Sequence, residues 1–114
     1  MASEIKVALE KFVNEFELEN LTPEIELDGR MLVQKFVNRP ALQLTGFFDH
    51  FDNTRIQIIG RIEHTYMRRQ TVETRIEIFD KLLSFHIPCI VFCRSLEPFP
   101  EMIEIADKYS VPIF

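Results

Sequence analysis

The feature that most limits how this chain can fold is the alternation of strand and helix patterns after residue 55. Three short apolar runs there are typical of buried strands: residues 55–60, 89–93 and 111–114. Two segments between them space their apolar side chains along one helical face: residues 71–84 and 98–109. Strands that alternate with helices through short loops predict a parallel sheet with right-handed crossovers. The fold class is therefore α/β, a small domain of two or three layers with a mostly parallel sheet.

The first half of the chain carries weaker signals. Apolar residues at helical spacing predict a helix over residues 4–15, with Ser3 as its N-cap. An apolar–polar alternation then predicts a short strand over residues 16–20. Residues 25–36 alternate around Asp28-Gly29, a pair that suits the turn of a hairpin between two short strands.

Length and charge exclude several classes of protein. The 114 residues suit a single domain, residues 1–114. The net charge of −5 disfavours binding to nucleic acid, because that affinity comes mainly from neutralising phosphates. With no apolar run near the roughly 18 residues of a membrane span and no signal-peptide pattern, we expect a cytoplasmic protein without membrane contact. The apolar residue Phe114 ends a predicted strand, which suggests a cut through a longer chain.

The two cysteines, Cys89 and Cys93, lie in one predicted strand. Residues four apart in a strand are separated by about 13 Å, which is too far for a disulfide or for a shared zinc ion. We therefore expect reduced thiols in a reducing compartment.

Motifs for catalysis are missing from the sequence. The chain has three glycines, Gly29, Gly46 and Gly60. Their spacing allows neither the phosphate-binding loop of nucleotide enzymes nor a Gly-x-Gly-x-x-Gly turn. The histidines are scattered along the chain: His50, His64 and His86. We therefore assign no catalytic residue, no metal ligand and no cofactor to this chain.

A contact surface is predicted between residues 46 and 69. Five arginines stand against two glutamates over residues 55–75, and aromatic, methionine and arginine side chains are enriched at interfaces. For the arginines themselves we favour a solvated helix face over a docking patch, and for Phe47 and Phe51 we favour packing in the core over exposure at an interface. Pro40 biases Arg39 toward an extended conformation, so we expect Arg39 to tie its loop to a carboxylate or to carbonyls, the alternative being an anionic ligand. The candidate contact residues are Arg39, Phe47, Phe48, Arg61, His64, Arg68 and Arg69.

Two stretches carry a recognisable motif: Asn-Arg-Pro-Ala-Leu-Gln-Leu-Thr-Gly-Phe-Phe at residues 38–48 and Arg-Ile-Gln-Ile-Ile-Gly-Arg-Ile-Glu at residues 55–63. Together they resemble the N-terminal domain of the HPr kinase/phosphorylase family, whose pattern runs Asn-Arg-Pro-Gly-Leu-x-Leu-x-Gly-Phe and then Arg-Ile-Gln-x-x-Gly-x-x-Glu. The resemblance extends over nearly the whole chain. Ala41 stands where the family usually has glycine; if that glycine serves a left-handed backbone, the loop here is built differently, and if it is only small, alanine serves.

The resemblance implies a function for the parent protein. Members of the family phosphorylate a serine of the phosphocarrier protein HPr in the bacterial sugar phosphotransferase system, remove that phosphate by phosphorolysis, and so control carbon catabolite repression. Their ATP-binding loop, catalytic acid/base and magnesium ligands belong to a C-terminal domain that would follow residue 114. The N-terminal domain is similar to the nucleotide-sugar-binding domain of muramyl ligases. HPr is thus the implied partner of the full-length enzyme, which we expect to be a homo-oligomer.

Two hypotheses of different class follow. In the first, the chain is a non-catalytic regulatory or assembly domain of a kinase/phosphorylase. In the second, it is a stand-alone module of the muramyl-ligase type that binds a nucleotide-sugar or a small anion.

Overall fold

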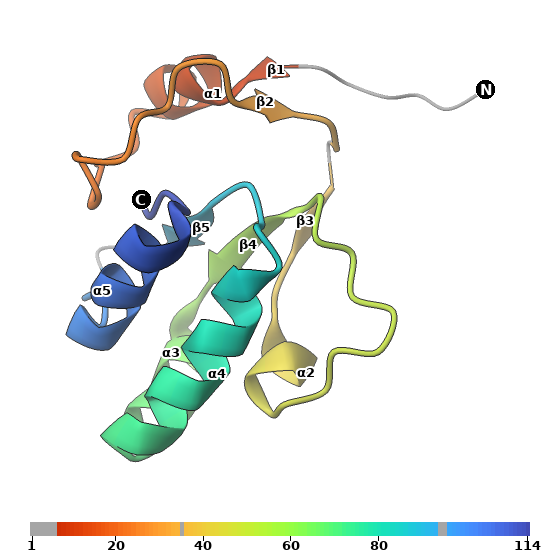
Figure 1. Ribbon diagram of the computed structural model, residues 1–114, viewed down its shortest axis with the longest axis vertical. Coiled ribbons are helices and arrows are strands. Elements are labelled where there is room, and N and C mark those ends of the chain that lie inside the picture. The colour runs from red at the N-terminus through yellow and green to blue at the C-terminus, as the bar shows by residue number, and fades with distance from the viewer. Residues whose placement is uncertain (1–6, 35, 94–95) are drawn as a thin grey trace.

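A three-stranded parallel sheet forms the centre of the computed structural model, which describes residues 7–34, 36–93 and 96–114 (Figure 1). The elements follow one another as β1 (Val7–Ala8), α1 (Leu9–Glu15), β2 (Met31–Leu32), β3 (Val37–Asn38), α2 (Ala41–Leu44), β4 (Ile56–Ile59), α3 (Arg61–Arg68), α4 (Val72–Ser84), β5 (Ile90–Phe92) and α5 (Pro100–Tyr109). The strand order is β3-β4-β5, and Ile113 forms a parallel bridge with Ile90 beyond β5. The predicted α/β class and parallel sheet are confirmed.

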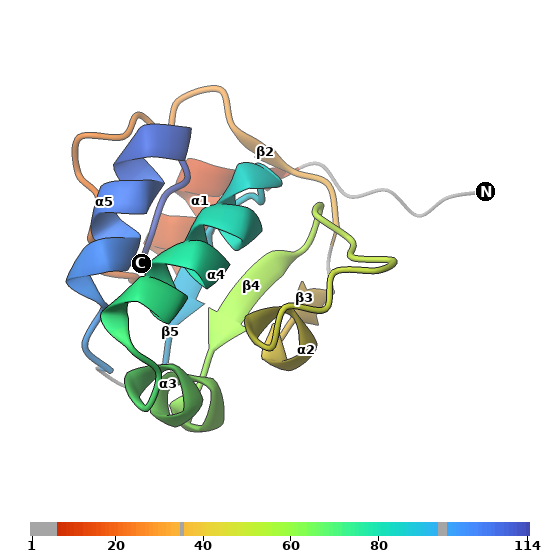
Figure 2. The same ribbon diagram turned by 60° about the horizontal axis from the view of Figure 1, so that its bottom comes forward.

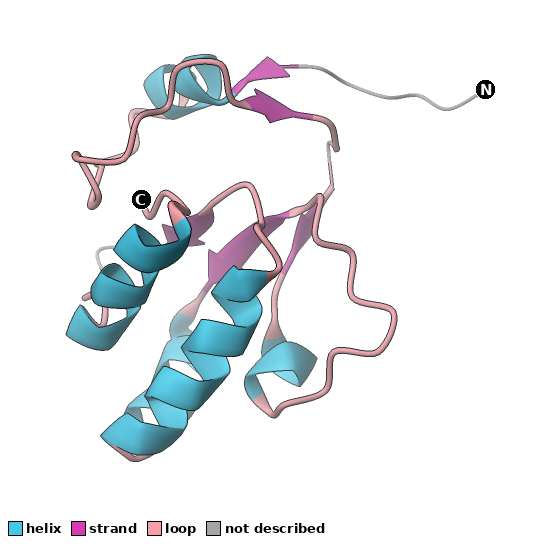
Figure 3. Cartoon of the chain, in the orientation of Figure 1, coloured by secondary structure: helices cyan, strands magenta, loops and turns pink. Residues whose placement is uncertain are grey.

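The domain has three layers (Figure 3). Helices α2, α4 and α5 cover one face of the sheet, while the N-terminal unit of β1, α1 and β2 covers the other. Successive strands that run in one direction with right-handed crossovers place all their connecting helices on the same face. Side chains of β4 therefore alternate: Ile59 enters the core beneath the helices, and Ile56 enters a smaller core beneath the N-terminal unit. Because both faces are covered, the strands are mostly apolar, and the polar side chains of β3 and β4, Asn38 and Gln57, hydrogen-bond to each other.

The second half of the chain follows the sequence prediction closely. Helix α4 begins after Thr71, whose hydroxyl oxygen accepts a hydrogen bond from the Thr74 amide at 3.1 Å. Helix α5 begins with Pro100 in its first turn and ends at Ser110, which adopts a left-handed conformation with φ 58°. The predicted last strand is confirmed only in part, as the Ile113 bridge and a hydrogen bond from the Phe92 amide to the Phe114 carbonyl at 2.8 Å.

The N-terminal prediction is wrong in three places. The helix begins at Leu9 because Val7–Ala8 pairs with β2 as a strand, and Ser3 lies outside the described residues. No strand forms at residues 16–20, since the backbone of Glu17 turns back with φ 51°. The turn at Asp28-Gly29 is present, but the strand after it pairs with β1 instead of closing a hairpin.

Three elements were not anticipated: β3, α2 and α3. Ala41 opens α2 in a helical conformation, so this position needs no left-handed backbone. Helix α3 lies at the end of the sheet where β4 ends, with α2 beside β3 (Figure 2).

The cysteines are free thiols, as predicted. Cys89 is buried, and burial raises the pKa of its thiol to about 12. Across the described ranges, the helices are too short or too polar to cross a bilayer.

Candidate functional site

The two stretches of the sequence motif, residues 38–48 and 55–63, contact each other through side-chain hydrogen bonds and an ion pair. Asn38, at the end of β3, donates a hydrogen bond from Nδ2 to Oε1 of Gln57 in β4 at 2.7 Å. Arg39 follows and pairs with Glu63 of α3, with 2.8 Å between Nη2 and Oε1. The parallel register places Asn38 opposite Gln57 and leaves Arg39 next to the point where β4 passes into α3. The motif therefore forms two side-chain ties, one between β3 and β4 and the other between the residue after β3 and the start of α3.

Glu63 is the centre of the second tie. Its side chain is 4% exposed, and its Oε1 also accepts a hydrogen bond from the Gly60 amide at 2.9 Å. Burial disfavours the charged carboxylate, but hydrogen bonds from Arg39 and from the backbone amides of Glu63 and Gly60 outweigh it and lower the pKa of Glu63. A side chain at residue 60 would collide with the Arg39 guanidinium and displace it from its position beside Glu63. The prediction that Arg39 ties its loop to a carboxylate is confirmed.

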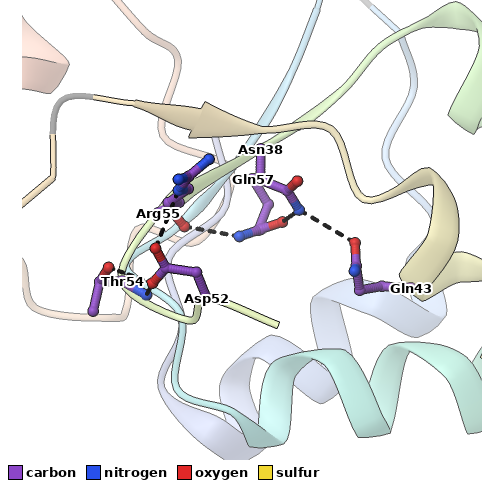
Figure 4. Close-up of polar contacts among 6 residues, drawn as sticks. All are labelled: Asn38, Gln43, Asp52, Thr54, Arg55 and Gln57. Atoms are coloured by element: carbon purple, nitrogen blue, oxygen red, sulfur yellow. Dashed lines mark hydrogen bonds and ion pairs between the residues drawn. The ribbon is translucent and has the colours of Figure 1, made fainter. Parts of the chain in front are cut away.

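A cluster of side-chain amides surrounds the first tie (Figure 4). Gln57 is fully buried, and its Nε2 donates to the Arg55 carbonyl at 2.8 Å. The Asn38 amide nitrogen also donates to Oε1 of Gln43, from α2, at 3.2 Å. The three amides thus link β3, β4 and α2, and this link could not be foreseen because α2 itself gave no clear signal in the sequence.

Asp52 and Arg55 form an ion pair beside the amides (Figure 4). Asp52 Oδ2 lies 3.1 Å from Arg55 Nε, and Oδ1 accepts hydrogen bonds from Thr54 Oγ1 at 2.5 Å and from the Thr54 amide at 3.0 Å. These Thr54 contacts, followed by the Arg55 charge, lower the pKa of Asp52. The pair therefore stays ionised and has no net charge at neutral pH.

These groups border a small cavity, which we call the amide cavity. It has a volume of about 190 Å³ and is lined by Asn38, Gln43, His50, Phe51, Asp52 and Arg55. It lies at the β3 edge of the sheet, between α2 and the loop that leads into β4. None of its lining residues except Asn38 belongs to a strand, which explains why strand and helix patterns did not reveal it.

The predicted contact residues fall into two groups. Arg61, Arg68 and Arg69 are exposed on and just after α3, beside Ile62 (72% exposed) and Tyr66 (39%). Within the described ranges these three arginines make no ion pair. We call this surface the α3 outer face.

Three of the other candidates, Arg39, His64 and Phe48, have partners inside the domain. His64 is buried: its Nε2 lies 2.8 Å from the Glu97 carbonyl oxygen, and its ring stacks on Phe99 with centroids 4.7 Å apart. Phe48 stacks on Phe85 with centroids 5.2 Å apart. Phe51 packs against the core as predicted, whereas Phe47 is 49% exposed, so the prediction of core packing is wrong for that residue.

The remaining arginines of the basic stretch are neutralised. Arg55 pairs with Asp52, and Arg75 pairs with Glu101, with 2.5 Å between Nε and Oε1. Arg75 also donates from Nη1 to the Gln70 carbonyl at 2.8 Å and so fixes the end of α3. In the part of the chain that the structure describes, no three His, Cys, Asp or Glu residues gather closely enough to hold a metal ion.

Comparison with known proteins gives one consistent result. Residues 7–114 match the family model described as "HPr Serine kinase N terminus". The chain is 51% identical over 108 residues to the HPr kinase/phosphorylase of Lachnoclostridium phytofermentans, covering 95% of this chain and 35% of that protein. It is 40% identical over 103 residues to the HPr kinase/phosphorylase of Caldicellulosiruptor bescii, covering 90% and 33%. The chain therefore spans about a third of the length of these curated relatives.

Proposed function

This chain belongs to the HPr serine kinase N-terminal family, and on that premise we propose that it is the non-catalytic regulatory or assembly domain of a bifunctional HPr kinase/phosphorylase. The parent enzyme would phosphorylate and dephosphorylate a serine of HPr in the cytoplasm and so control carbon catabolite repression. ATP and magnesium would be held by the rest of that enzyme. The full-length enzyme would form a homo-oligomer.

The α3 outer face is the observation that carries this proposal. It presents three arginines without ion-pair partners in the described ranges, next to two exposed apolar side chains, on a chain whose net charge is −5. Arginine and tyrosine are enriched at the centres of protein interfaces. The polar residues of the motif, by contrast, pair with each other and stabilise the fold. This division favours a domain that positions a partner surface over one that performs chemistry.

The proposal has a direct test in the full-length enzyme. Arg68→Glu with Arg69→Glu reverses the charge of the α3 outer face while leaving the buried residues of α3 in place. We expect unchanged unfolding of the domain, together with altered oligomeric state by light scattering or altered regulation of HPr phosphorylation. Lys11→Glu, on the opposite layer, is the matched control. Unchanged assembly and unchanged regulation in the double variant would contradict a role for this face.

The absence of catalysis is tested on the chain alone. Incubation with HPr, ATP and magnesium, followed by mass spectrometry, should detect no phosphoserine on HPr. Phosphorylation of HPr by the 114-residue chain would contradict the proposal.

A further inference from the structure

We propose that the amide cavity binds a small neutral polyol, a molecule with neighbouring hydroxyl groups and no larger than about one sugar ring. The inference concerns a ligand of the domain itself, and it is independent of whether the α3 outer face binds a partner. It rests on three properties of the cavity: amide atoms in its lining that have no protein partner among the described residues, the charge of the lining residues, and the cavity volume.

The unused groups come from two amides. Gln43 is 8% exposed, and its Oε1 accepts from Asn38, but its Nε2 has no acceptor among the described residues. Asn38 donates from Nδ2 to both Gln43 and Gln57, whereas its Oδ1 has no side-chain or backbone donor in the same ranges. Both side chains line the cavity. Among the described residues no side-chain nitrogen or oxygen is both buried and unpaired, so the Gln43 amide nitrogen is open to the cavity, where a ligand hydroxyl can take the place of water.

A hydroxyl group matches this pair of amides. One hydroxyl can accept from Gln43 Nε2 while it or its neighbour donates to Asn38 Oδ1, since each hydroxyl is both donor and acceptor. Arg55 and Asp52, which also line the cavity, offer a second donor–acceptor pair. A molecule with several neighbouring hydroxyl groups can hydrogen-bond to the two amides and to the Asp52–Arg55 pair at the same time. A single amide or a single charged group cannot do so.

The charge of the walls favours a neutral ligand. The Asp52 carboxylate and the Arg55 guanidinium compensate each other, so this pair, which lines the cavity together with His50, adds no net charge that would attract an anion. A phosphate placed near Arg55 would also approach the Asp52 carboxylate, and the repulsion between like charges opposes binding. Phe51 also lines the cavity, so the C–H groups of a polyol have an apolar side chain to contact.

The volume limits the size of the ligand. About 190 Å³ corresponds to roughly six water molecules at about 30 Å³ each. Cavities for larger ligands measure roughly 300–1,000 Å³, so these walls would enclose only part of a nucleotide-sugar.

Nuclear magnetic resonance of the ¹⁵N-labelled chain tests the proposal directly. Glucose and glycerol are the probes, and glucose 6-phosphate and acetamide are the comparison compounds. We expect saturable shifts in the side-chain NH₂ signals of Gln43 and Asn38 with glucose or glycerol, and weaker effects with the phosphate and with acetamide. No shift with either polyol overturns the proposal. Larger shifts with glucose 6-phosphate than with glucose would contradict a neutral ligand. Larger shifts with acetamide than with either polyol would contradict a ligand that binds through hydroxyl groups.

One variant isolates the critical donor. Gln43→Glu keeps the oxygen that accepts from Asn38 but replaces the free NH₂ with a carboxylate oxygen, and we expect polyol affinity to fall about tenfold. Gln34→Glu, which makes the same chemical change in the N-terminal unit away from the cavity, should bind as the natural chain does. Equal affinity in Gln43→Glu and Gln34→Glu overturns the assignment. If Gln43→Glu does not fold, the side-chain shifts of the natural chain decide the outcome.

Discussion

The two edges of the central sheet are held by different kinds of interaction. At the β3 edge, a strand of two residues is fixed by polar side chains, through Asn38–Gln57 and Arg39–Glu63. At the opposite edge, residues 111–114 run beside β5 and are buried together with the apolar faces of α4 and α5. There the Ile113 amide donates to Thr22 Oγ1 at 3.0 Å, so the N-terminal unit also covers this edge.

This difference explains what each edge looks like in the sequence. A side-chain hydrogen bond or ion pair requires particular groups at particular positions, so the β3 edge appears as a motif of named residue types. Apolar packing accepts many combinations of residues with similar volume, so the β5 edge appears only as a hydrophobic pattern. The family resemblance was found through the β3 edge for this reason.

The largest effect should come from the apolar side of the comparison. Phe79 of α4 is fully buried and packs against Phe99, with centroids 5.6 Å apart. Phe79→Ala should lower the free energy of unfolding by about 3–5 kcal/mol, because it leaves a cavity in the core. Chemical denaturation measures this, and Val72→Ala, on the exposed side of α4, should change it by less than about 0.5 kcal/mol. If Phe79→Ala lowers the free energy of unfolding by less than substitutions at the β3 edge do, apolar packing is not the stronger of the two kinds of interaction.

Substitutions at the β3 edge should lower the free energy of unfolding by less, and the effect should depend on the Glu63 carboxylate. Glu63→Gln removes the charge that pairs with Arg39 but keeps an oxygen for the Gly60 amide, so we expect a loss of about 1–3 kcal/mol in unfolding free energy. Arg39→Ala should lower the free energy of unfolding by at least as much, because it leaves the buried Glu63 carboxylate without its cation. Combining the two substitutions in a double-mutant cycle should reveal coupling, and additive effects would show that the ion pair contributes nothing.

The same tie makes stability depend on pH. The folded pKa of Glu63 lies below its ordinary value of 4.5, so the ionised carboxylate contributes stability above that value and loses it as the pH falls through the folded pKa. The difference in unfolding free energy between the natural chain and Glu63→Gln should therefore be constant near neutral pH and shrink below about pH 4.5. Urea denaturation of both proteins at several pH values checks this. A difference that persists undiminished in acid would mean that the charge is not responsible.

The smallest effect is expected from an exposed ion pair. Lys108 and Asp80 lie 3.0 Å apart between α5 and α4, and both side chains are largely open to solvent. Lys108→Met should leave the free energy of unfolding nearly unchanged, because water and salt screen such pairs. If Lys108→Met lowers the free energy of unfolding as much as Glu63→Gln does, burial does not determine how strongly these two ion pairs stabilise the fold. Thermal unfolding at low and high salt distinguishes the two cases.

The sequence predicted the second half of the fold better than the first for a physical reason. From β4 onward, each element has an apolar face and recognisable boundaries, such as the Thr71 cap and Pro100. In the N-terminal unit, Val7–Ala8 reads as part of a helix because its strand conformation depends on pairing with Met31–Leu32, which is distant in sequence. Helix α2 has only four residues, too few to produce a periodic pattern.

By itself, the sequence determined the alternation of strands and helices and the residue types of the motif, because apolar periodicity and local caps act over neighbouring residues. Only the tertiary structure decided which motif residues pair. Asn38 meets Gln57 across 19 residues and Arg39 meets Glu63 across 24, since the parallel register of β3 and β4 brings them together. The same register, with α2 folded over it, leaves Asn38 Oδ1 and Gln43 Nε2 beside one cavity. A hydrogen bond depends on distances of a few tenths of an ångström, and those distances exist only once the sheet has formed.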